Sequence, residues 1–264
     1  MGLNVVLERH TELPEKYLHS KEFSALNFLG CVTISSRLRD SYISKGMPSE
    51  KIIVEHDGVT LSDYKIKEDK LDIRKNMNLP IDKYIITYSV HLHDFKGIPL
   101  ILNAAKQLKD DLFLLIGGWE HDIKRVQLEC RKREINNVIC YGYVKPKLIP
   151  KLLVASDLFL LPTAAKHKWS KDISPLKMFE YMASGRPIVA SNLESISRVF
   201  KNEKNALLFE PASFESLKEK ILFIKKDEDK AKMLASQAKL DVEYYEWGKR
   251  ARRIIEFIED RLFG

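Results

Sequence analysis

Two carboxylates eight positions apart flank the start of a predicted helix. Asp172 and Glu180 enclose the sequence Ile-Ser-Pro-Leu-Lys-Met-Phe, and the apolar stripe of the helix consists of Leu176, Phe179 and Ala183. Glu180 lies at the edge of that stripe, so its carboxylate is partly desolvated and needs hydrogen-bond donors. The vicinal hydroxyls of a sugar can donate two hydrogen bonds to one such carboxylate. The pattern therefore indicates a ligand that contains a sugar.

The first turn of the same helix is suited to an anion. Ser174 is a good N-cap, Pro175 fits the first helical position, and Gly185 predicts the helix end. The amides from Ser174 to Leu176, together with the helix dipole, favour a phosphate group. A diol at one end and a phosphate at the other describe a nucleotide sugar. The alternative, an ordinary amphipathic helix whose Glu180 meets a lysine, fits the spacing equally well.

A second segment with charged groups runs from Tyr88 to Gly97, between a predicted strand and the next helix. Open α/β sheets bind ligands at such places, and His91 and Lys96 can both reach a phosphate there. A solvated lysine is the simpler interpretation of Lys96 when the segment is taken by itself. His10 follows the first predicted strand and is either a site residue or the polar end of that strand.

Strand and helix patterns alternate along the chain, which predicts an α/β fold with a doubly wound parallel sheet. Most expected strands are continuous apolar runs, as strands covered on both faces should be. They are residues 5–7, 31–34, 51–54, 84–88, 112–116, 138–141, 158–161, 187–190 and 206–209. Further helices are expected at residues 97–108 and 148–155 and throughout from about residue 214. The last helix is predicted to carry one apolar stripe, made of Ala251, Ile254, Ile255, Ile258 and Leu262.

The polar stretch from Leu61 to Asn78 separates three expected strands from six, and we place the domain linker there. This division predicts a partial first domain over residues 1–63 and a larger domain over residues 79–245. Residues 246–264 form the C-terminal helix. The first domain has too few elements for a complete doubly wound domain.

Composition narrows the class of protein. With 45% hydrophobic and 31% charged residues among 264, the chain is expected to be a soluble globular protein. It has no apolar run near the roughly 20 residues of a membrane span and no visible secretory signal, so the cytoplasm is the expected compartment. Cys31, Cys130 and Cys140 form no C-x-x-C pair and are interpreted as reduced thiols. The net charge of +7 suits an anionic partner, but the absence of a nucleic-acid-binding motif argues against nucleic acid.

Taken in this order, the segments resemble the GT-B-fold retaining glycosyltransferases of family 4 (group 1), over nearly the whole chain. The landmarks are Ile34-Ser-Ser-Arg-Leu-Arg39, Gly46-Met-Pro-Ser-Glu-Lys-Ile52, Asp57-Gly-Val59, His91-Leu with Lys96-Gly97, Cys140-Tyr-Gly-Tyr-Val144, Ala155-Ser-Asp-Leu-Phe-Leu-Leu-Pro162 and Ser174-Pro-Leu-Lys-Met-Phe-Glu-Tyr-Met-Ala-Ser-Gly-Arg-Pro187. The resemblance implies a nucleotide-sugar donor domain with a partial, Rossmann-like acceptor-side domain. The implied activity is sugar transfer with retention of anomeric configuration and without a bound metal or other cofactor.

By this resemblance, the acid-x7-acid motif of the family falls on Asp172 and Glu180. Glu180 would hold the donor ribose, and Asp172 would hold hydroxyls of the transferred sugar. The pyrophosphate would lie against the helix start formed by Ser174, Pro175 and Leu176.

The resemblance assigns the remaining site residues to three other segments. His91 stands where the family often has an arginine, and Lys96 matches the lysine of the family, so together they would neutralise the leaving diphosphate. Tyr143 would lie in the loop near the base. His10 with Thr11 looks like the histidine of the first domain that faces the donor sugar across the cleft. The catalytic candidates are thus His10 and Asp172.

Three departures from the family pattern limit the transfer of these roles. Asp172 replaces the commoner, longer glutamate, which affects donor sugar preference, and His91 makes phosphate binding depend on pH. The chain is also shorter than the roughly 300–400 residues of two complete domains. The expected ligands are a UDP- or GDP-linked sugar and a glycan or lipid-linked acceptor.

The short first domain leaves an alternative function open. In this alternative the chain is a non-catalytic or partner-dependent nucleotide-sugar-binding subunit, and a protein partner or a homodimer completes the acceptor half. The basic, amphipathic C-terminal helix leaves two further alternatives, peripheral contact with a membrane or packing on the domains.

Overall fold

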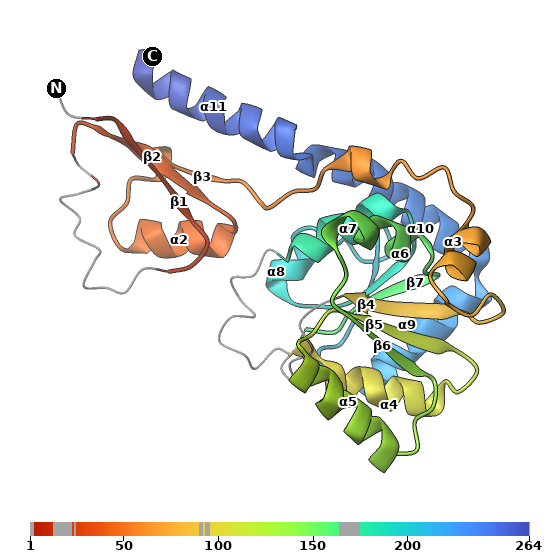
Figure 1. Ribbon diagram of the computed structural model, residues 1–264. Coiled ribbons are helices and arrows are strands. Elements are labelled where there is room, and N and C mark those ends of the chain that lie inside the picture. The colour runs from red at the N-terminus through yellow and green to blue at the C-terminus, as the bar shows by residue number, and fades with distance from the viewer. Residues whose placement is uncertain are drawn as a thin grey trace.

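The computed structural model describes residues 3–12, 23, 25–89, 92, 96–163 and 175–263, and Figure 1 shows their arrangement. The larger sheet of this part has six parallel strands: β4 (Ile85–Ser89), β5 (Leu112–Ile116), β6 (Val138–Gly142), β7 (Leu158–Leu161), β8 (Ile188–Ser191) and β9 (Leu207–Phe209). Their spatial order is β6-β5-β4-β7-β8-β9, so the strand order reverses between β4 and β7. This order confirms the predicted doubly wound α/β fold. Such sheets bind ligands beside the carboxyl ends of the strands at the reversal.

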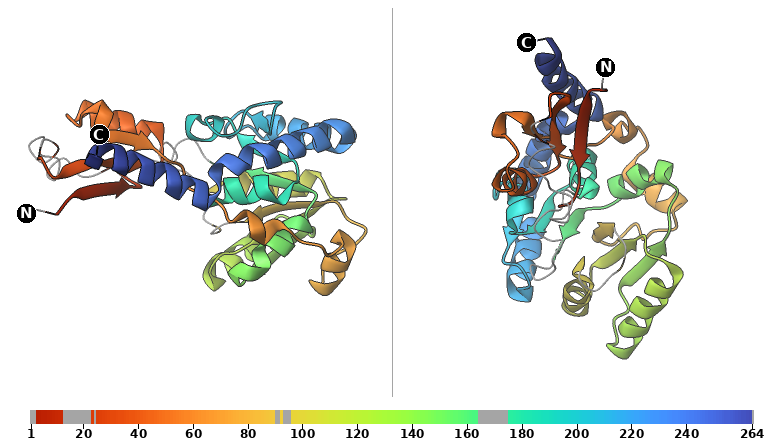
Figure 2. Two further views of the ribbon diagram at one scale, coloured as in Figure 1. Left: turned by 90° about the horizontal axis from the view of Figure 1, so that it is seen from above. Right: turned by 90° about the vertical axis from the view of Figure 1, so that its left-hand side faces the viewer.

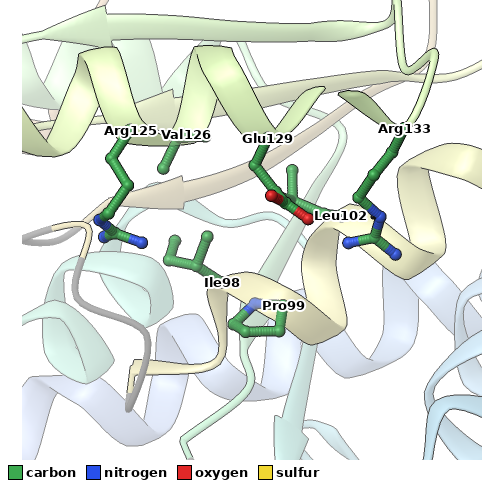
Figure 3. Close-up of a pocket in the computed structure, with 7 residues that line it drawn as sticks. All are labelled: Ile98, Pro99, Leu102, Arg125, Val126, Glu129 and Arg133. Atoms are coloured by element: carbon green, nitrogen blue, oxygen red, sulfur yellow. Dashed lines mark ion pairs between the residues drawn. The ribbon is translucent and has the colours of Figure 1, made fainter. Parts of the chain in front are cut away.

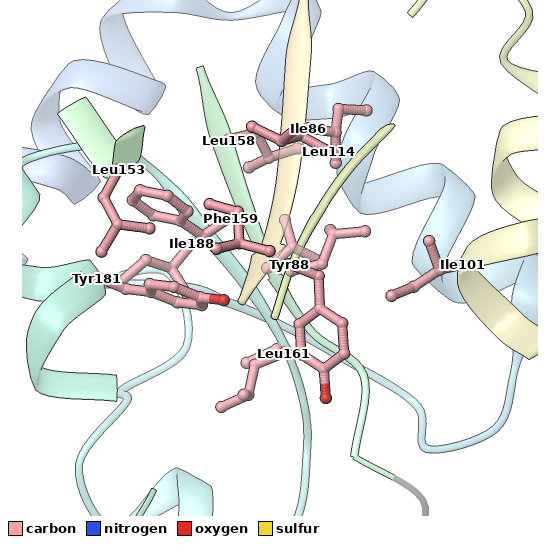
Figure 4. Close-up of a cluster of buried hydrophobic side chains, with 14 of the residues drawn as sticks. Ile86, Tyr88, Ile101, Leu114, Leu153, Leu158, Phe159, Leu161, Tyr181 and Ile188 are labelled. Carbon is pink, nitrogen blue, oxygen red and sulfur yellow. The ribbon is translucent and has the colours of Figure 1, made fainter. Parts of the chain in front are cut away.

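Helices cover both faces of this sheet, which explains why its strands are apolar. The covering helices are α4 (Ile98–Gln107), α5 (Glu120–Lys132), α6 (Ile149–Val154), α7 (Leu176–Ser184), α9 (Phe214–Lys226) and α10 (Glu228–Asp241). Figure 1 shows α4 and α5 below the sheet and α6 and α7 above it. Phe159 of β7 stacks on Tyr181 of α7 with ring centroids 4.2 Å apart (Figure 4). This stacking holds α7 against a strand at the reversal.

A smaller parallel sheet in the order β1-β2-β3 is formed by the N-terminal part of the described chain. Its elements are β1 (Val5–Arg9), β2 (Phe28–Thr33), β3 (Ile52–Val54) and the covering helix α2 (Ser36–Ser44). The helix begins where the Ser35 hydroxyl accepts a hydrogen bond from the amide of Leu38 over 3.3 Å. A separate apolar cluster that includes Phe28, Tyr42 and Ile52 forms the core of this unit.

The segment that was predicted to link two domains folds onto the larger sheet. It contains η3 (Leu61–Tyr64) and α3 (Lys70–Asn76). The guanidinium of Arg74, which is almost fully buried, lies 2.6 Å from Asp157, and the ammonium of Lys70 lies 2.7 Å from the same carboxylate. The other short elements are η2 (Ser49–Lys51), η5 (Pro146–Leu148), α8 (Glu194–Ser197) and η6 (Val242–Tyr245).

Two chain segments cross side by side between the two units. The amide of Val59 donates to the carbonyl of Tyr245 over 3.0 Å, and the amide of Trp247 donates to the carbonyl of Val59 over 3.3 Å. Gly58 permits this approach, because a Cβ at that position would lie 2.3 Å from the carbonyl oxygen of Tyr245. We call residues 57–60 and 244–247 the crossing pair.

The C-terminal helix α11 (Trp247–Phe263) runs back along the smaller sheet, and Figure 2 shows both termini at that end. Its buried residues are Arg250 and Phe257, whereas Ile255 is 52% exposed. Ala251 and Leu262 are exposed as well. Three of the five residues of the apolar stripe are therefore exposed, so the stripe as a whole does not pack on the domains.

The buried face of α11 differs because arginines contribute to it. The guanidinium of Arg250 lies 2.6 Å from Glu8, and Arg253 donates two hydrogen bonds, of 2.8 and 2.7 Å, to the carboxylate of Glu55. Phe257 packs directly on Gly30 of β2, where a Cβ would lie 2.7 Å from its ring. Paired charges and one aromatic ring thus replace the aliphatic stripe.

Candidate active site

A cavity of about 420 Å³ lies at the carboxyl ends of the six-stranded sheet. It is lined by Gly58, Val59, Thr60, Asp63, Tyr64, Ser89, Val144, Pro146, Ile149, Pro150, Leu176, Glu180 and Trp247. These residues come from the crossing pair, from η3, from the last residue of β4, from the segment between β6 and α6, from the start of α6 and from α7. The cavity therefore occupies the place where this fold class binds ligands.

Glu180 lies in the wall of this cavity, half-buried on the second turn of α7. Burial raises the pKa of its carboxyl group, and the positive charge of Lys177 partly opposes the rise. The hydroxyl of Tyr181, the next residue, accepts a hydrogen bond from the amide of Ser89 over 2.8 Å. The helix that carries the carboxylate is thus tied directly to the end of β4.

The positive charge of Lys177 acts on this carboxylate, and the charge of Lys96 acts on Lys177. Burial lowers the pKa of Lys96, which lies just before α4. Burial and the nearby charge of Lys96 lower the pKa of Lys177 to about 8, although Glu180 acts in the opposite direction. Among the described residues, the ammonium of Lys177 has no hydrogen bond or ion pair. The sequence analysis did not single out Lys177. Its position one helical turn before Glu180 was visible in the sequence, and residues at this spacing are neighbours on a helix.

The start of α4 approaches the end of β7 closely, which places Lys96 at the strand reversal. Gly97 has a φ of +88°, and a Cβ there would lie 2.0 Å from the carbonyl oxygen of Pro162. The hydroxyl of Tyr88 donates to the carbonyl of Lys96 over 2.8 Å. The close packing of Gly97 and the hydrogen bond from Tyr88 therefore fix the backbone position of Lys96.

The first turn of α7 begins one residue later than predicted. Pro175 has a ψ of 120° and is the N-cap, so Leu176 rather than Pro175 is the first helical residue. The amide of Met178 donates to the carbonyl of Pro175 over 2.8 Å, and proline has no amide hydrogen. The amides of Leu176 and Lys177 consequently remain for an anion at this helix start.

Three predicted site residues, His91, Asp172 and Ser174, lie outside the described residues. Tyr143 directly follows β6 and is 79% exposed. It does not line the cavity, although the next residue, Val144, does.

His10 is exposed at the end of β1 and belongs to a charged cluster. Its Nε2 lies 3.2 Å from Oε1 of Glu8, which is also the carboxylate oxygen that pairs with Arg250. Burial raises the pKa of Asp57, and the charges of His10 and Arg250 partly oppose that rise. Because Gly58 lines the cavity, this cluster lies next to its rim.

A second hollow, of about 330 Å³, lies between α4 and α5 (Figure 3). Its apolar floor includes Ile98 and Leu102, and Arg125 and Arg133 stand on either side of Glu129. Arg133 lies 3.9 Å from Glu129 and also donates to Asn103. The hollow shares no lining residue with the first cavity. Of the helices described, none is long and apolar enough to cross a membrane.

Comparison with known families identifies the larger unit. A sequence model of the family described as glycosyl transferases group 1 matches residues 69–241, which is more than half of the chain. The chain belongs to this family. The match covers the six-stranded sheet, α7 and seven of the thirteen residues that line the cavity.

Curated relatives are named as glycosyltransferases, and a solved structure shares the fold. An uncharacterized glycosyltransferase of Methanocaldococcus jannaschii is 22% identical over 249 residues, which cover 91% of this chain and 62% of that protein. The N,N'-diacetylbacillosaminyl-diphospho-undecaprenol alpha-1,3-N-acetylgalactosaminyltransferase of Campylobacter jejuni is 26% identical over 81% of this chain and 56% of its own length. The crystal structure of Anabaena HepE in complex with UDP-glucose matches with a TM-score of 0.80 at 19% identity, over 97% of this chain and 72% of HepE.

These matches confirm the fold class, and each curated relative is covered only in part. The fold is the Rossmann-like, parallel-sheet fold of GT-B glycosyltransferases. The chain spans 62% and 56% of the two curated relatives.

Proposed function

We propose that this chain binds a nucleotide-diphosphate sugar in the cavity and transfers the sugar to a glycan or a lipid-linked acceptor, with retention of anomeric configuration. The observation that carries the proposal is the half-buried carboxylate of Glu180 in the cavity wall, close to the positive charge of Lys177 and at the edge of the sheet where Lys96 lies. A carboxylate accepts hydrogen bonds from a diol, and adjacent cations bind a diphosphate. HepE, solved with UDP-glucose, and the relative named for a diphospho-undecaprenol substrate support the same classes of ligand.

The ligand would lie along the first two turns of α7. Glu180 accepts hydrogen bonds from the ribose hydroxyls, and the free amides at the helix start bind the pyrophosphate. Lys96 neutralises the charge of the diphosphate together with His91. Tyr143, in the loop after β6, lies on the side of the base.

The transferred sugar would lie between the two units. Asp172 binds its hydroxyls, and His10 faces it from the smaller sheet. As the bond between the sugar and the diphosphate breaks, negative charge develops on the leaving group. Cations and helix amides that are already in place stabilise this charge, so we expect transfer to continue in the presence of EDTA.

Binding of nucleoside diphosphates tests the donor site. We expect one of UDP, GDP and ADP to bind in a calorimetric titration, and Glu180→Gln to weaken that affinity by about 10- to 100-fold, the loss of a charged hydrogen bond. Glu120→Gln is the matched control, because Glu120 is exposed on α5 and, among the described residues, pairs with Lys124 on the same helix surface. Equal affinities of the two variants would contradict the proposed role of Glu180.

Turnover of the donor tests the activity separately from binding. The purified chain should release nucleoside diphosphate from the matching nucleotide sugar, and NMR of the anomeric proton of the product should show retention. A chain that binds the diphosphate but releases none with glycan or lipid-linked acceptors would instead support the partner-dependent binding subunit.

A further inference from the structure

We propose that a further cavity, at the amino ends of the six-stranded sheet, is a second ligand site that binds a small phosphate monoester. This cavity has a volume of about 480 Å³ and shares no lining residue with the cavity that contains Glu180. Its position follows from Tyr84, Asp157 and Pro187, which line it and directly precede β4, β7 and β8. The second site is thus separate from the one in which we place the nucleotide sugar.

The cavity has an excess of positive charge. Four basic and two acidic side chains line it, and their ion-pair partners outside the lining add one charge of each sign among the described residues. The lining groups are Lys70, Arg186, Lys225, Lys232, Asp157 and Glu228, and the outside partners are Arg74 and Asp111. Five basic and three acidic side chains leave two positive charges. A phosphate monoester, which carries about −1.5 to −2 charges at neutral pH, matches this excess.

The carboxylate of Asp157 is already engaged by other groups. Its oxygens accept hydrogen bonds from Lys70 over 2.7 Å, from Arg74 over 2.6 Å and from the amide of Ile85 over 2.7 Å. Two cations therefore share this single negative charge. A third cation that lines the same cavity needs an anion from elsewhere.

Arg186 is that third cation. In the described part of the chain it forms no ion pair, whereas each lysine of the lining pairs with a carboxylate. The half-buried guanidinium donates through Nε and one Nη to the carbonyl oxygen of Val154, over 3.2 and 2.8 Å. Its other Nη has no partner among the described residues and remains accessible. The planar fork of an arginine is well suited to a phosphate group.

The rest of the lining indicates that the ligand has an organic body. Pro187, Ile224 and Ala235 give the cavity an apolar part, and the hydroxyls of Tyr84 and Ser236 have no hydrogen-bond partner among the described residues. The volume lies within the roughly 300–1,000 Å³ of small-molecule sites. A free phosphate ion would use the basic groups alone. A phosphate ester would also cover the apolar part and add the free energy of that burial.

Calorimetric titration with phenyl phosphate tests this inference. Phenyl phosphate combines a phosphate monoester with an apolar ring, whereas inorganic phosphate and benzyl alcohol each have one of these features. We expect the wild type to bind phenyl phosphate with a Kd of about 1 mM or below, at least about tenfold more tightly than either of the other two probes. In NMR spectra of the same titration, the amides of Gly185 and Arg186 should shift.

Two variants locate the binding. Arg186→Gln removes the unpaired charge, and Ser236→Trp places a large side chain in the cavity from an exposed position on α10. Each should weaken phenyl phosphate binding by about tenfold or more. Arg198→Gln is the control for the first variant, because Arg198 is also half-buried but lies outside the lining. Met233→Trp is the control for the second, because Met233 is exposed on α10 and does not line the cavity.

Glu180→Gln separates the two sites and should bind phenyl phosphate as the wild type does. If Glu180→Gln loses binding and Arg186→Gln keeps it, the probe occupies the other cavity and the second site is overturned. Unchanged affinity in both Arg186→Gln and Ser236→Trp would overturn it as well. Equal affinities of the wild type for phenyl phosphate and inorganic phosphate would overturn the choice of a monoester. Melting curves without ligand show whether each variant folds, and if Arg186→Gln does not, Ser236→Trp decides.

Discussion

Truncation of Phe257 tests the packing of α11 on the smaller sheet. Phe257 is 7% exposed and packs on Gly30, and the guanidinium of Arg261 lies 3.7 Å above its ring. An aromatic side chain buries roughly 150–250 Å², which at about 25 cal/mol per Å² corresponds to about 4–6 kcal/mol. Measured truncations of Phe to Ala cost about 3–5 kcal/mol, so we expect Phe257→Ala to destabilise this unit by about 4 kcal/mol.

Hydrogen exchange followed by mass spectrometry reports this loss locally. A change of about 4 kcal/mol accelerates exchange through opening by nearly three orders of magnitude, and we expect this effect in the amides of β2 but not in those of β5. Ile255→Ala is the matched control, because Ile255 lies on the same helix but is half exposed, and it should change stability by less than about 0.5 kcal/mol. Faster exchange in Ile255→Ala than in Phe257→Ala would refute this orientation of α11. It would indicate instead that the aliphatic stripe is the face that packs on the smaller sheet.

Two further substitutions test the parts that position the site. Gly97→Ala should lower the free energy of unfolding by about 1–3 kcal/mol, because it combines a left-handed φ with a clash on the Pro162 carbonyl. Urea denaturation measures this change. An unchanged free energy of unfolding would contradict the close approach. Asp157→Asn should cost about 3–5 kcal/mol, because it leaves buried Arg74 without its carboxylate. Burial alone would raise the pKa of Asp157, but hydrogen bonds from Lys70, the Ile85 amide and Arg74 lower it. Its contribution to stability is therefore present above pH 3.8 and lost as the pH falls further, so the difference in melting temperature between wild type and Asp157→Asn should shrink in acid.

Apolar runs between turn residues predicted the strands well. All nine expected strands are present. A strand such as Leu112–Ile116 is buried on both faces, and a short, continuous apolar run is typical of such a strand. The helix end at Gly185 was also predictable, because its φ of +66° needs a residue that tolerates the left-handed region.

Features that depend on pairing across the chain could not be predicted in this way. The buried face of α11 includes Arg250, whose partner Glu8 is more than two hundred residues away, so a pattern of apolar residues could not reveal it. The effect of Lys96 on Lys177 was hidden for the same reason, because Lys96 lies outside α7. The position of Glu180 at the edge of an apolar helix stripe could be read from the local sequence, and its role in binding stays a prediction.

The crossing pair links the shape of the cavity to the relative position of the two units. Residues 58–60 and Trp247 belong both to the two chain segments that pass between the units and to the wall of the cavity. The two segments are hydrogen-bonded to each other, and both contribute residues to the wall. Any change in the relative position of the two units would therefore displace part of the cavity wall. A ligand that contacts these residues would, for the same reason, favour one relative position of the units.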